Sequence, residues 1–479
     1  MQGKGPGTLA SKAQDQVMME INEIEVDSYE LQHKVYAKKV RGKFRNLRWA
    51  VAGVLLSIYF IVPWLKIGGR HPILFDIPGR KFYVLGSVYW PQDVFYLALL
   101  LIVLTGVLFI FTAVAGRLWC GYACPQSVFT DIFISIERFL EGDALRRQRL
   151  DDGSWGAVKI GKKVSKHVVW LAISFWVAFT FVAYFIAAEV LLERIITGTL
   201  TWSNIFWLLF FTASVYAFCA LWRELICLVP CPYGRFQSAL IDADSLVIGY
   251  DAKRGEPRGH KLRGDNKESN KEKLGDCIDC SLCVQVCPTG IDIRNGLQCE
   301  CIGCALCIDA CNAVMCKIGR PKGLIRYTSM RALAGGETKV IRPRVIVYTI
   351  CIVLLFGFFA YKLHSRIPLE MQILRDRTAL YIKGADGSIT NVYTLRVTNM
   401  DIDDHKYKVS TADLDGQLKV RLSMGANPIT VKSGEVYEGL LVLTSEKVVE
   451  QKINHLNFIV ESVGDKALQA TRDATFVMP

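Results

Sequence analysis

The segment CIDCSLCVQVCPTGIDIRNGLQCECIGCALCIDAC, residues 277–311, decides how the middle of this 479-residue chain folds. It contains two runs of four cysteines with one spacing, C-x2-C-x2-C-x3-C. Pro288 follows the first run, and Asn312 follows the second, where proline is usual. None of the 16 cysteines lies in residues 1–119 or 352–479. This clustering indicates metal ligation in a reducing compartment, because a disulfide framework would spread its cysteines along a small secreted domain.

Tandem runs of this spacing are typical of the bacterial ferredoxin fold with two [4Fe–4S] clusters, in which the fourth cysteine of each run ligates the other cluster. The first ligand set is therefore predicted to be Cys277, Cys280, Cys283 and Cys311. The second is predicted to be Cys301, Cys304, Cys307 and Cys287. Structural zinc is the alternative, because CxxC pairs also bind zinc, but two tandem runs overfill tetrahedral sites.

The composition outside this segment predicts a membrane protein. Hydrophobic residues make up 51% of the chain, and the mean hydropathy of +0.26 is too apolar for a purely soluble protein of this size. Five charge-free apolar stretches have lengths that suit transmembrane helices. They are Trp49–Leu65, Val94–Gly116, Val168–Ala188, Ile195–Trp222 and Val345–Tyr361.

The basic residues that give the net charge of +12 lie mainly next to the predicted membrane helices. Lysine and arginine gather before the first stretch and between the second and third, which predicts that these loops are cytoplasmic. An odd number of spans then places residues 362–479 outside, which is the periplasm if the source is a Gram-negative bacterium, with the cysteine runs inside. The exported tail is close to neutral, so the charge needs no nucleic acid partner.

A second cysteine pattern occurs twice, each time after an apolar stretch. Cys120 and Cys124 belong to CGYACP at 120–125, and Cys227 and Cys231 belong to CLVPCP at 227–232. The common offset of 107 residues, from 120 to 227 and from 124 to 231, indicates an internal repeat of a two-helix unit. A C-x3-C spacing places both sulfurs on one helix face if the helix continues to the proline. Such thiolates favour Cu(I); the alternative is that they are small, inert residues at tight helix ends.

The last part of the chain changes to short alternating runs separated by Gly, Asp and Asn turns, which predicts strands. The predicted strands are 389–399, 405–411, 418–424, 436–445 and 455–462. Their number and spacing suit an immunoglobulin-like β-sandwich over residues 363–479, without the Cys-Trp-Cys signature.

The fold class that follows is a multi-domain membrane protein: a five-span α-helical transmembrane bundle with an inserted bacterial-type 2[4Fe–4S] ferredoxin domain and a C-terminal immunoglobulin-like β-sandwich. The expected boundaries are an N-terminal tail at 1–48, a four-helix membrane region at 49–248, a polar tether at 249–276, the ferredoxin domain at 277–330, the fifth helix at 345–361 and the sandwich at 363–479.

This arrangement resembles the FixG/RdxA/CcoG family of cytochrome c oxidase accessory proteins. The resemblance rests on the two cysteine runs, the stretch NAVMCKIGRPKGLIRYTS at 312–329, both CxxxCP copies and the β-rich tail, and it covers the chain beyond residue 30. It implies a membrane-bound iron–sulfur carrier that reduces Cu(II) to Cu(I), with catalytic thiols at the CxxxCP copies, for assembly of cbb3-type oxidase. The implied location is the bacterial inner membrane.

The partners implied by the resemblance are oxidase assembly factors or copper carriers and an unidentified electron donor, and homo-oligomerisation is left open. Two alternatives remain at this point. One is a quinol-linked electron-transfer subunit resembling those of periplasmic nitrate reductase systems, which share the CxxxCP and ferredoxin patterns. The other is a non-catalytic scaffold in which the clusters are structural and the sandwich recruits oxidase subunits.

Overall fold

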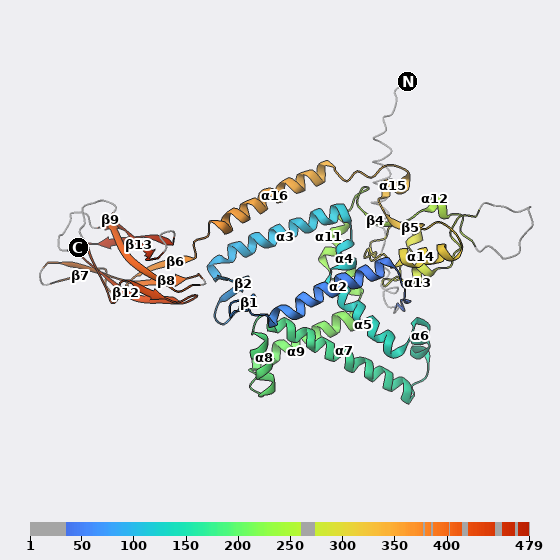
Figure 1. Ribbon diagram of the computed structural model, residues 1–479, viewed down its shortest axis with the longest axis horizontal. Helices are drawn as coiled ribbons and strands as arrows, with labels where there is room; N and C mark the ends of the chain where they lie inside the picture. The colour runs from blue at the N-terminus through green and yellow to red at the C-terminus, as the bar shows by residue number, and fades with distance from the viewer. Residues whose placement is uncertain are drawn as a thin grey trace, which may run out of the picture. The chain divides into compact units, whose positions relative to one another are not determined.

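The computed structural model describes residues 35–259, 274–376, 379–384, 387–401, 403–413, 420–445, 453–464 and 468–478 (Figure 1). The chain divides into two compact units. The first unit consists of Met1–Ala52, Thr112–Ile173 and Ser214–Val340, and the second consists of Gly53–Phe111, Ser174–Ala213 and Ile341–Pro479. Most of the predicted N-terminal tail and residues 260–273 of the predicted tether lie outside the described residues.

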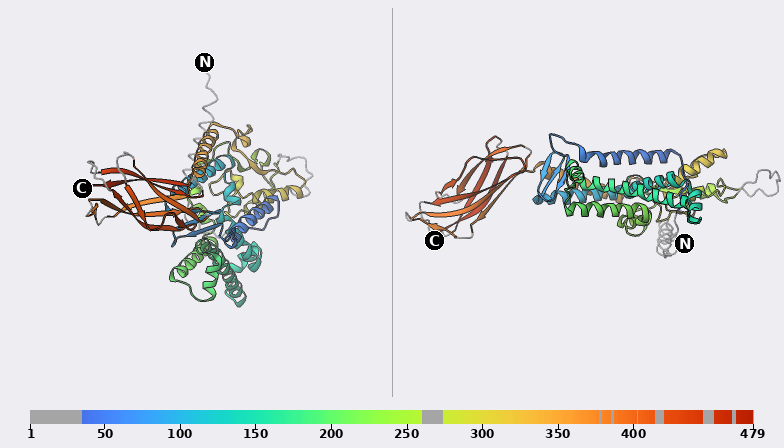
Figure 2. Two further views of the ribbon diagram at one scale, coloured as in Figure 1. Left: turned by 60° about the vertical axis from the view of Figure 1, so that its left-hand side comes forward. Right: turned by 90° about the horizontal axis from the view of Figure 1, so that it is seen from below.

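Five helices in the described part of the chain are long and apolar enough to cross a membrane, which confirms the five-span prediction (Figure 2). They run over Lys43–Trp64 (α2 and η2), Pro91–Ala115 (η3 and α3), Ala157–Ala183 (α7), Trp202–Trp222 (α9 and η4) and Pro343–His364 (α16).

Three of these helices begin six or more residues away from the start of their apolar runs, and the first of them begins at Lys43 instead of Trp49. The third starts at Ala157, well before the apolar run, because lysines interleaved with apolar residues extend the same helix. The fourth starts at Trp202, because Ala188–Ile196 forms a separate helix, α8, that is followed by Gly198 with a left-handed φ of +69°. Glycine adopts that conformation without steric cost and so allows the chain to turn.

A small antiparallel sheet in the second unit has no counterpart in the sequence prediction. Its strands are β1 (Ile73–Asp76), β2 (Lys81–Val84) and β3 (Ser87–Tyr89), in the order β1-β2-β3. Such short strands with half-buried side chains give too little alternation to be recognised in one sequence.

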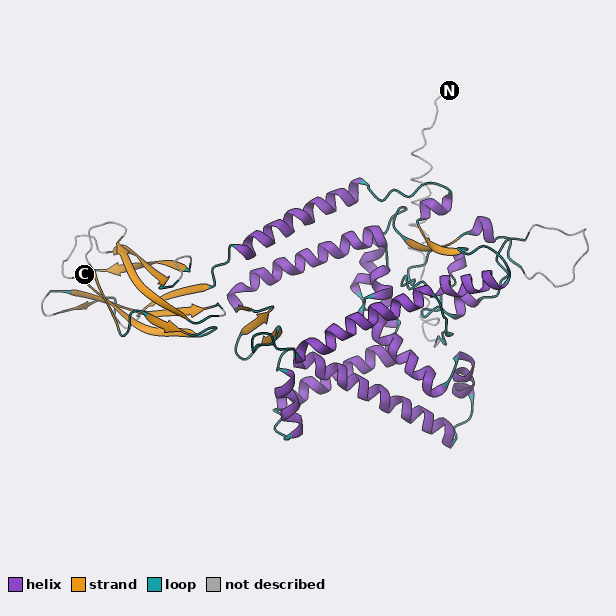
Figure 3. Ribbon diagram, viewed as in Figure 1, coloured by secondary structure: helices purple, strands orange, loops and turns teal. Residues whose placement is uncertain are grey.

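The C-terminal domain in the same unit is an all-β sandwich, as predicted (Figure 3). One sheet has the order β10-β12-β8-β6, with β7 also paired to β8; the other has the order β11-β9-β13-β14. The first sheet comprises β6 (Leu369–Arg375), β7 (Ile382–Lys383), β8 (Ile389–Asn399), β10 (Val420–Met424) and β12 (Val436–Ser445). The second comprises β9 (His405–Asp413), β11 (Ile429–Val431), β13 (Ile453–Ser462) and β14 (Gln469–Val477).

Alternate residues of the sandwich strands form one core between the sheets. Tyr393 and Leu395 on β8 pack with Leu443 on β12 and with Phe458 on β13, and all four are buried. No cysteine lies in the domain, so apolar burial holds it together, at about 25 cal/mol per Å² of apolar surface. Strands β8 and β12 have the predicted bounds, whereas β6, β7, β11 and β14 were not predicted.

Three helices of the first unit follow the second membrane helix. These are α4 (Leu118–Tyr122), α5 (Pro125–Glu141) and α6 (Ala144–Asp152). After the fourth membrane helix come α10 (Leu225–Leu228) and α11 (Pro232–Leu240). The chain then enters the cysteine-rich part, which holds α12 (Ala252–Gly255), α13 (Leu282–Gln285), η6 (Ile293–Asn295), α14 (Leu306–Lys317) and α15 (Met330–Ala334).

Two strands close the cysteine-rich part. Strand β4 (Val247–Tyr250) pairs antiparallel with β5 (Ile325–Thr328), and Ile248 and Ile325 are buried in its core. Residues 249–259, predicted as the start of a polar tether, therefore form part of this domain. The strand VIGY was not predicted, because it is only four residues long and a polar, glycine-rich sequence follows it.

A buried ionic cluster in the first unit anchors α5. The Glu137 carboxylate is fully buried and contacts Arg223 at 2.9 Å, Arg147 at 3.1 Å and Lys166 at 3.4 Å. Removing one partner of such a buried pair costs about 3–5 kcal/mol, because an uncompensated charge remains. Since α5 follows the first CxxxCP copy and Arg223 precedes the second, the cluster fixes both copies relative to each other.

Candidate functional site

The two cysteine runs adopt the same backbone conformation. The residue before the second cysteine of each run has a left-handed φ, 52° at Asp279 and 68° at Gly303. The residue after that cysteine is left-handed again, 52° at Ser281 and 61° at Ala305, and each begins a helix that carries the third cysteine. Turns of this kind form concavities of backbone N–H groups, which occur at many iron–sulfur sites.

Each run contributes to two separate cavities. The first cavity is lined by Cys277, Cys280 and Cys283 of the first run and by Cys311 of the second. The second cavity is lined by Cys301, Cys304 and Cys307 of the second run and by Cys287 of the first, with Cys283 also on its wall. The fold thus brings together the two sets that the crossed ligation pattern requires, one in each cavity.

The chemistry of both cavities fits an iron–sulfur cluster. Burial raises the pKa of Cys283 to about 11 and the pKa values of Cys301 and Cys311 to about 12. Backbone N–H groups offset part of this effect: those of Gly303 and Ile325 donate to the sulfurs of Cys301 and Cys311. Buried thiols that already accept N–H bonds are suited to become thiolates once iron supplies positive charge.

The described residues contain no group of three or more His, Cys, Asp or Glu side chains that could hold a single metal ion. The assignment of the eight cysteines as cluster ligands stays a prediction that the shape of the two cavities supports.

The CxxxCP copies share a break between their two cysteines. Cys120 lies in α4 and Cys227 in α10, whereas Cys124 and Cys231 have extended backbones, with ψ of 125° and 110°, and are the N-cap residues of α5 and α11. The helix therefore does not continue to the proline. Proline is favoured at the first helical position and forces the preceding residue out of the helical region, so each second cysteine starts a new helix.

Although each pair is split, the four CxxxCP thiols lie within electrostatic reach of one another. Burial raises the pKa of Cys120 to about 12, and negative charge on Cys124, Cys227 or Cys231 raises it further. The pKa of Cys227 is raised to about 12 by the same causes, burial first and then charge on Cys124. The Cys120 Sγ also donates a weak hydrogen bond of 3.9 Å to the buried Gln237 side chain.

The first CxxxCP copy packs directly on the second cysteine run. A Cβ atom added at Gly121, between Cys120 and Cys124, would lie 2.8 Å from the Gly303 carbonyl oxygen and 2.9 Å from the Cys304 Cα atom. Only glycine permits this backbone approach. Cys120 also packs against the apolar cluster that contains Cys304. The CxxxCP thiols and the second cavity are therefore neighbours.

Arg117 joins the three cysteine-bearing segments. Its guanidinium donates to the carbonyl oxygen of Cys299, to that of Cys301 at 3.2 Å and to that of Gly234 at 2.9 Å. Gly234 follows the second CxxxCP copy, and the other two carbonyls belong to the second run. One side chain thus holds both copies against the second cavity and places a positive charge beside Cys120 and Cys301.

Sequence reasoning missed Arg117, Gly121 and Gln237. Their closeness to a CxxxCP motif was visible, but their partners lie more than 100 residues away. The remaining four cysteines line neither cysteine cavity and belong to neither CxxxCP copy. Cys299, Cys316 and Cys351 are exposed, and Cys219 is buried.

Comparison with known protein families assigns domains to these regions. Residues 222–330 match a 4Fe-4S dicluster domain, and residues 97–142, which include the first CxxxCP copy, match a 4Fe-4S binding domain. Residues 359–479 match the immunoglobulin-like fold found at the C-terminus of FixG.

Curated relatives extend the similarity over most of the chain. The nitrogen fixation protein FixG of Rhizobium meliloti is 39% identical over 78% of this chain and 78% of its own length. Protein RdxB of Cereibacter sphaeroides is 38% identical over 93% of this chain and 92% of its own. Protein RdxA of the same organism is 38% identical over 81% of this chain and 84% of its own. With its cysteine cavities, its five apolar helices and its C-terminal sandwich, the chain belongs to the FixG/RdxA family.

Proposed function

We propose that this iron–sulfur electron-transfer protein reduces Cu(II) to Cu(I) at the CxxxCP thiols, and that the Cu(I) serves assembly of cbb3-type cytochrome c oxidase. The single observation that carries the proposal is the backbone contact of Gly121 with Gly303 and Cys304. It puts the first CxxxCP copy next to the wall of the second cluster cavity, and the thiols of the second copy lie within electrostatic reach of Cys120. Thiolates prefer Cu(I) to harder ions, so the product of the reduction is the form that they hold best.

The charge and proton balance of this step follows from the thiols. When bound, the [4Fe–4S] clusters supply single electrons, and one electron converts one Cu(II) to Cu(I). With pKa values of about 12, Cys120 and Cys227 are neutral at pH 7. Each thiol that becomes a Cu(I) ligand therefore releases one proton.

The two cavities suggest a direction for the electrons. Cys280 of the first set is exposed, whereas Cys304 of the second set is buried and faces the CxxxCP copy. Electrons from a donor would therefore enter at the first set and leave from the second. We place both sets on the cytoplasmic side, because basic residues gather in the same unit, and the sandwich in the periplasm, where oxidase assembly factors or copper carriers are its expected partners.

Stopped-flow reoxidation of the reduced clusters tests this proposal. The protein is purified anaerobically, reduced, and mixed with Cu(II) in one arm and with a soluble quinone in the other. We expect rapid reoxidation by Cu(II), slowed at least about tenfold in the C120S/C124S and C227S/C231S variants with both clusters intact. The exposed C316S variant is the matched control and should behave as the wild type.

The other outcomes identify the competing functions. Reoxidation by quinone but not by Cu(II) would support the quinol-linked carrier. Normal oxidase assembly in cells whose protein lacks Cys304 or Cys280 would support a scaffold in which the clusters only stabilise the fold.

A further inference from the structure

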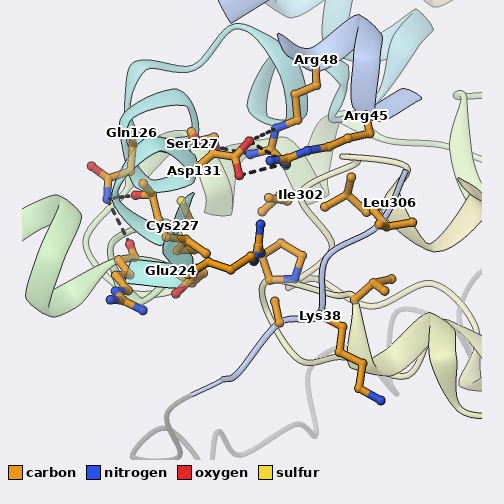
Figure 4. Close-up of a pocket in the computed structure, with 18 residues that line it drawn as sticks. Lys38, Arg45, Arg48, Gln126, Ser127, Asp131, Glu224, Cys227, Ile302 and Leu306 are labelled. Carbon is orange, nitrogen blue, oxygen red and sulfur yellow. Dashed lines mark hydrogen bonds and ion pairs between the residues drawn. The ribbon is translucent and has the colours of Figure 1, made fainter. Parts of the chain in front are cut away.

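A cavity in the first unit lies between α2, α5, the second CxxxCP copy and the loops of the second cysteine set (Figure 4). One wall is polar, and the other consists mainly of apolar side chains that flank the cluster ligands, among them Pro288, Ile302 and Leu306. The Cys227 thiol lies on its edge. A molecule bound here would touch both the Cys227 thiol and residues next to the ligands of the second cavity.

The charges of this cavity favour an anion. Five cationic side chains line it against two acidic ones, an excess of three positive charges when both acids are ionised. The cations are Lys38, Arg45, Arg48, Arg138 and Arg223, and the acids are Asp131 and Glu224. Burial raises the pKa of Glu224, which increases the positive excess whenever its carboxyl group is protonated. A hydrated divalent cation is therefore disfavoured in the cavity.

Most of these cations already have partners. Arg45 donates to both carboxylate oxygens of Asp131, at 2.8 and 2.9 Å, and Arg48 donates to the Ser127 carbonyl oxygen at 3.1 Å. Arg223 is paired with Glu137. These contacts hold the polar wall in a fixed arrangement, in which Asp131 neutralises only one of the two arginines beside it (Figure 4).

Two cations of this cavity, Lys38 and Arg138, have no side-chain hydrogen bond or ion pair among the described residues, and Arg138 is the one with a buried donor atom. Among the described residues its guanidinium has no hydrogen bond and no ion pair, and its Nε atom is buried without an acceptor. Burial and the neighbouring charges of Arg147 and Arg45 lower its pKa. A buried donor without an acceptor costs free energy. An acceptor from outside the chain would remove that cost.

The size of the cavity limits the anion. Its volume is about 40 Å³, room for about three waters at 10–15 Å³ each. Space of this size favours a compact ligand such as a single tetrahedral oxyanion, whose oxygen atoms can take the places of the waters. We propose that this cavity is a phosphate-type oxyanion site in which Arg138 is the principal ligand, filled either by free phosphate or by the phosphate of a lipid headgroup. The proposal does not depend on whether copper is the electron acceptor.

An anion in this place would also act on the adjacent cluster. It would touch Pro288 and Ile302, which directly follow Cys287 and Cys301 of the second set. Negative charge near a cluster opposes its reduction, so occupancy should lower the midpoint potential of the second cluster more than that of the first. The site would thereby tune electron transfer to the CxxxCP thiols.

Isothermal titration with inorganic phosphate tests the site. The full-length protein with both clusters loaded is kept in a maltoside detergent, which carries no phosphate. We expect one saturable phosphate site per chain, weakened about tenfold to a hundredfold by R138Q and less by R138K, which keeps the charge. Arg149 is exposed and outside the cavity, so R149Q is the matched control and should bind as the wild type. Cluster absorbance in every variant shows that the domain is intact.

A second arm distinguishes the two sources of phosphate. In nanodiscs that contain phosphatidylglycerol, a lipid-occupied site should exclude inorganic phosphate from the wild type and retain the lipid in an Arg138-dependent way. Phosphate binding that persists beside this lipid indicates free phosphate. The proposal is overturned if R138Q binds both phosphate and phosphatidylglycerol as the wild type does, or if neither binds saturably.

Discussion

The two cysteine cavities have the same spacing and the same left-handed turns, but their surroundings differ. In the first, Cys280 is exposed, and Arg294 on the wall is paired with Asp292 and Asp279. In the second, Cys304 is 7% exposed and lies under α4, with Arg117 as the nearby cation. Solvent exposure and hydrogen bonding to sulfur set cluster potentials. The cysteine motif therefore selects the cofactor, whereas the packing around it decides what each cofactor does.

Loss of one ligand should show the largest difference between the two cavities. C280S and C304S each remove one ligand, so we expect iron to fall from about eight to about four atoms per chain in both. Reoxidation by Cu(II) should be abolished in C304S, because the remaining cluster is remote from the CxxxCP thiols. In C280S the second cluster should still be reoxidised once it is reduced chemically. Iron analysis and stopped-flow traces provide the test, and equal rates in the two variants would contradict the proposed direction.

The rate of thiol alkylation should distinguish the buried CxxxCP thiols beside the second cavity from cysteines at the surface. At pH 8 a thiol with a pKa of about 12 is ionised in only about one molecule in 10⁴. Iodoacetamide should therefore modify the exposed Cys316 first and Cys120 and Cys227 last in the cluster-loaded protein. Since the thiolate is the nucleophile, the rates at Cys120 and Cys227 should rise about tenfold per pH unit between pH 7 and 9. Peptide mass spectrometry measures this order, and rates at these two thiols that do not change with pH would argue against the raised pKa values.

A methyl group at Gly121 should separate α4 from the second cavity. The added Cβ atom meets backbone of Gly303 and Cys304, which cannot move aside as a flexible side chain can. We expect G121A to lower the free energy of unfolding by about 1–3 kcal/mol and to slow reoxidation by Cu(II). Gly161, in α7, has open space around it, so G161A is the matched control. Wild-type melting and kinetics in G121A would show that the contact is not needed.

Replacement of Arg117 or Arg294 by glutamine should give the smallest and most selective effect. R117Q removes the positive charge beside the second cavity, and R294Q removes the one on the wall of the first. Each should lower the midpoint potential of its own cluster by on the order of 50 mV and leave the other nearly unchanged. Redox titration followed by electron paramagnetic resonance resolves the two shifts. If both variants shifted the same cluster, the assignment of one arginine to each site would be wrong.

The sequence predicted the features that depend on local spacing. The five apolar runs became helices, strands 389–399 and 436–445 formed with the predicted bounds, and the crossed cysteine sets meet in the two cavities. The features that remained hidden depend on contacts between distant segments. Nothing near Arg117 in the sequence points to the Cys301 carbonyl, and a charged residue such as Glu137 on an amphipathic helix is usually expected to face solvent. The break at Cys124 is predictable from the proline that follows it, because proline disfavours a helical conformation in the preceding residue.

The contact between Gly121 and Gly303 also sets an order of events during synthesis. The two glycines are separated by 182 residues, from 121 to 303. At about 5–20 residues per second, a ribosome needs roughly 10–40 s to make the second after the first. During that interval the nascent chain carries Cys120 and Cys124 without the loop that later covers them. A cell that makes this protein must therefore keep these two soft thiols reduced and free of stray metal until the segment around Gly303 has been synthesised and can pack against them.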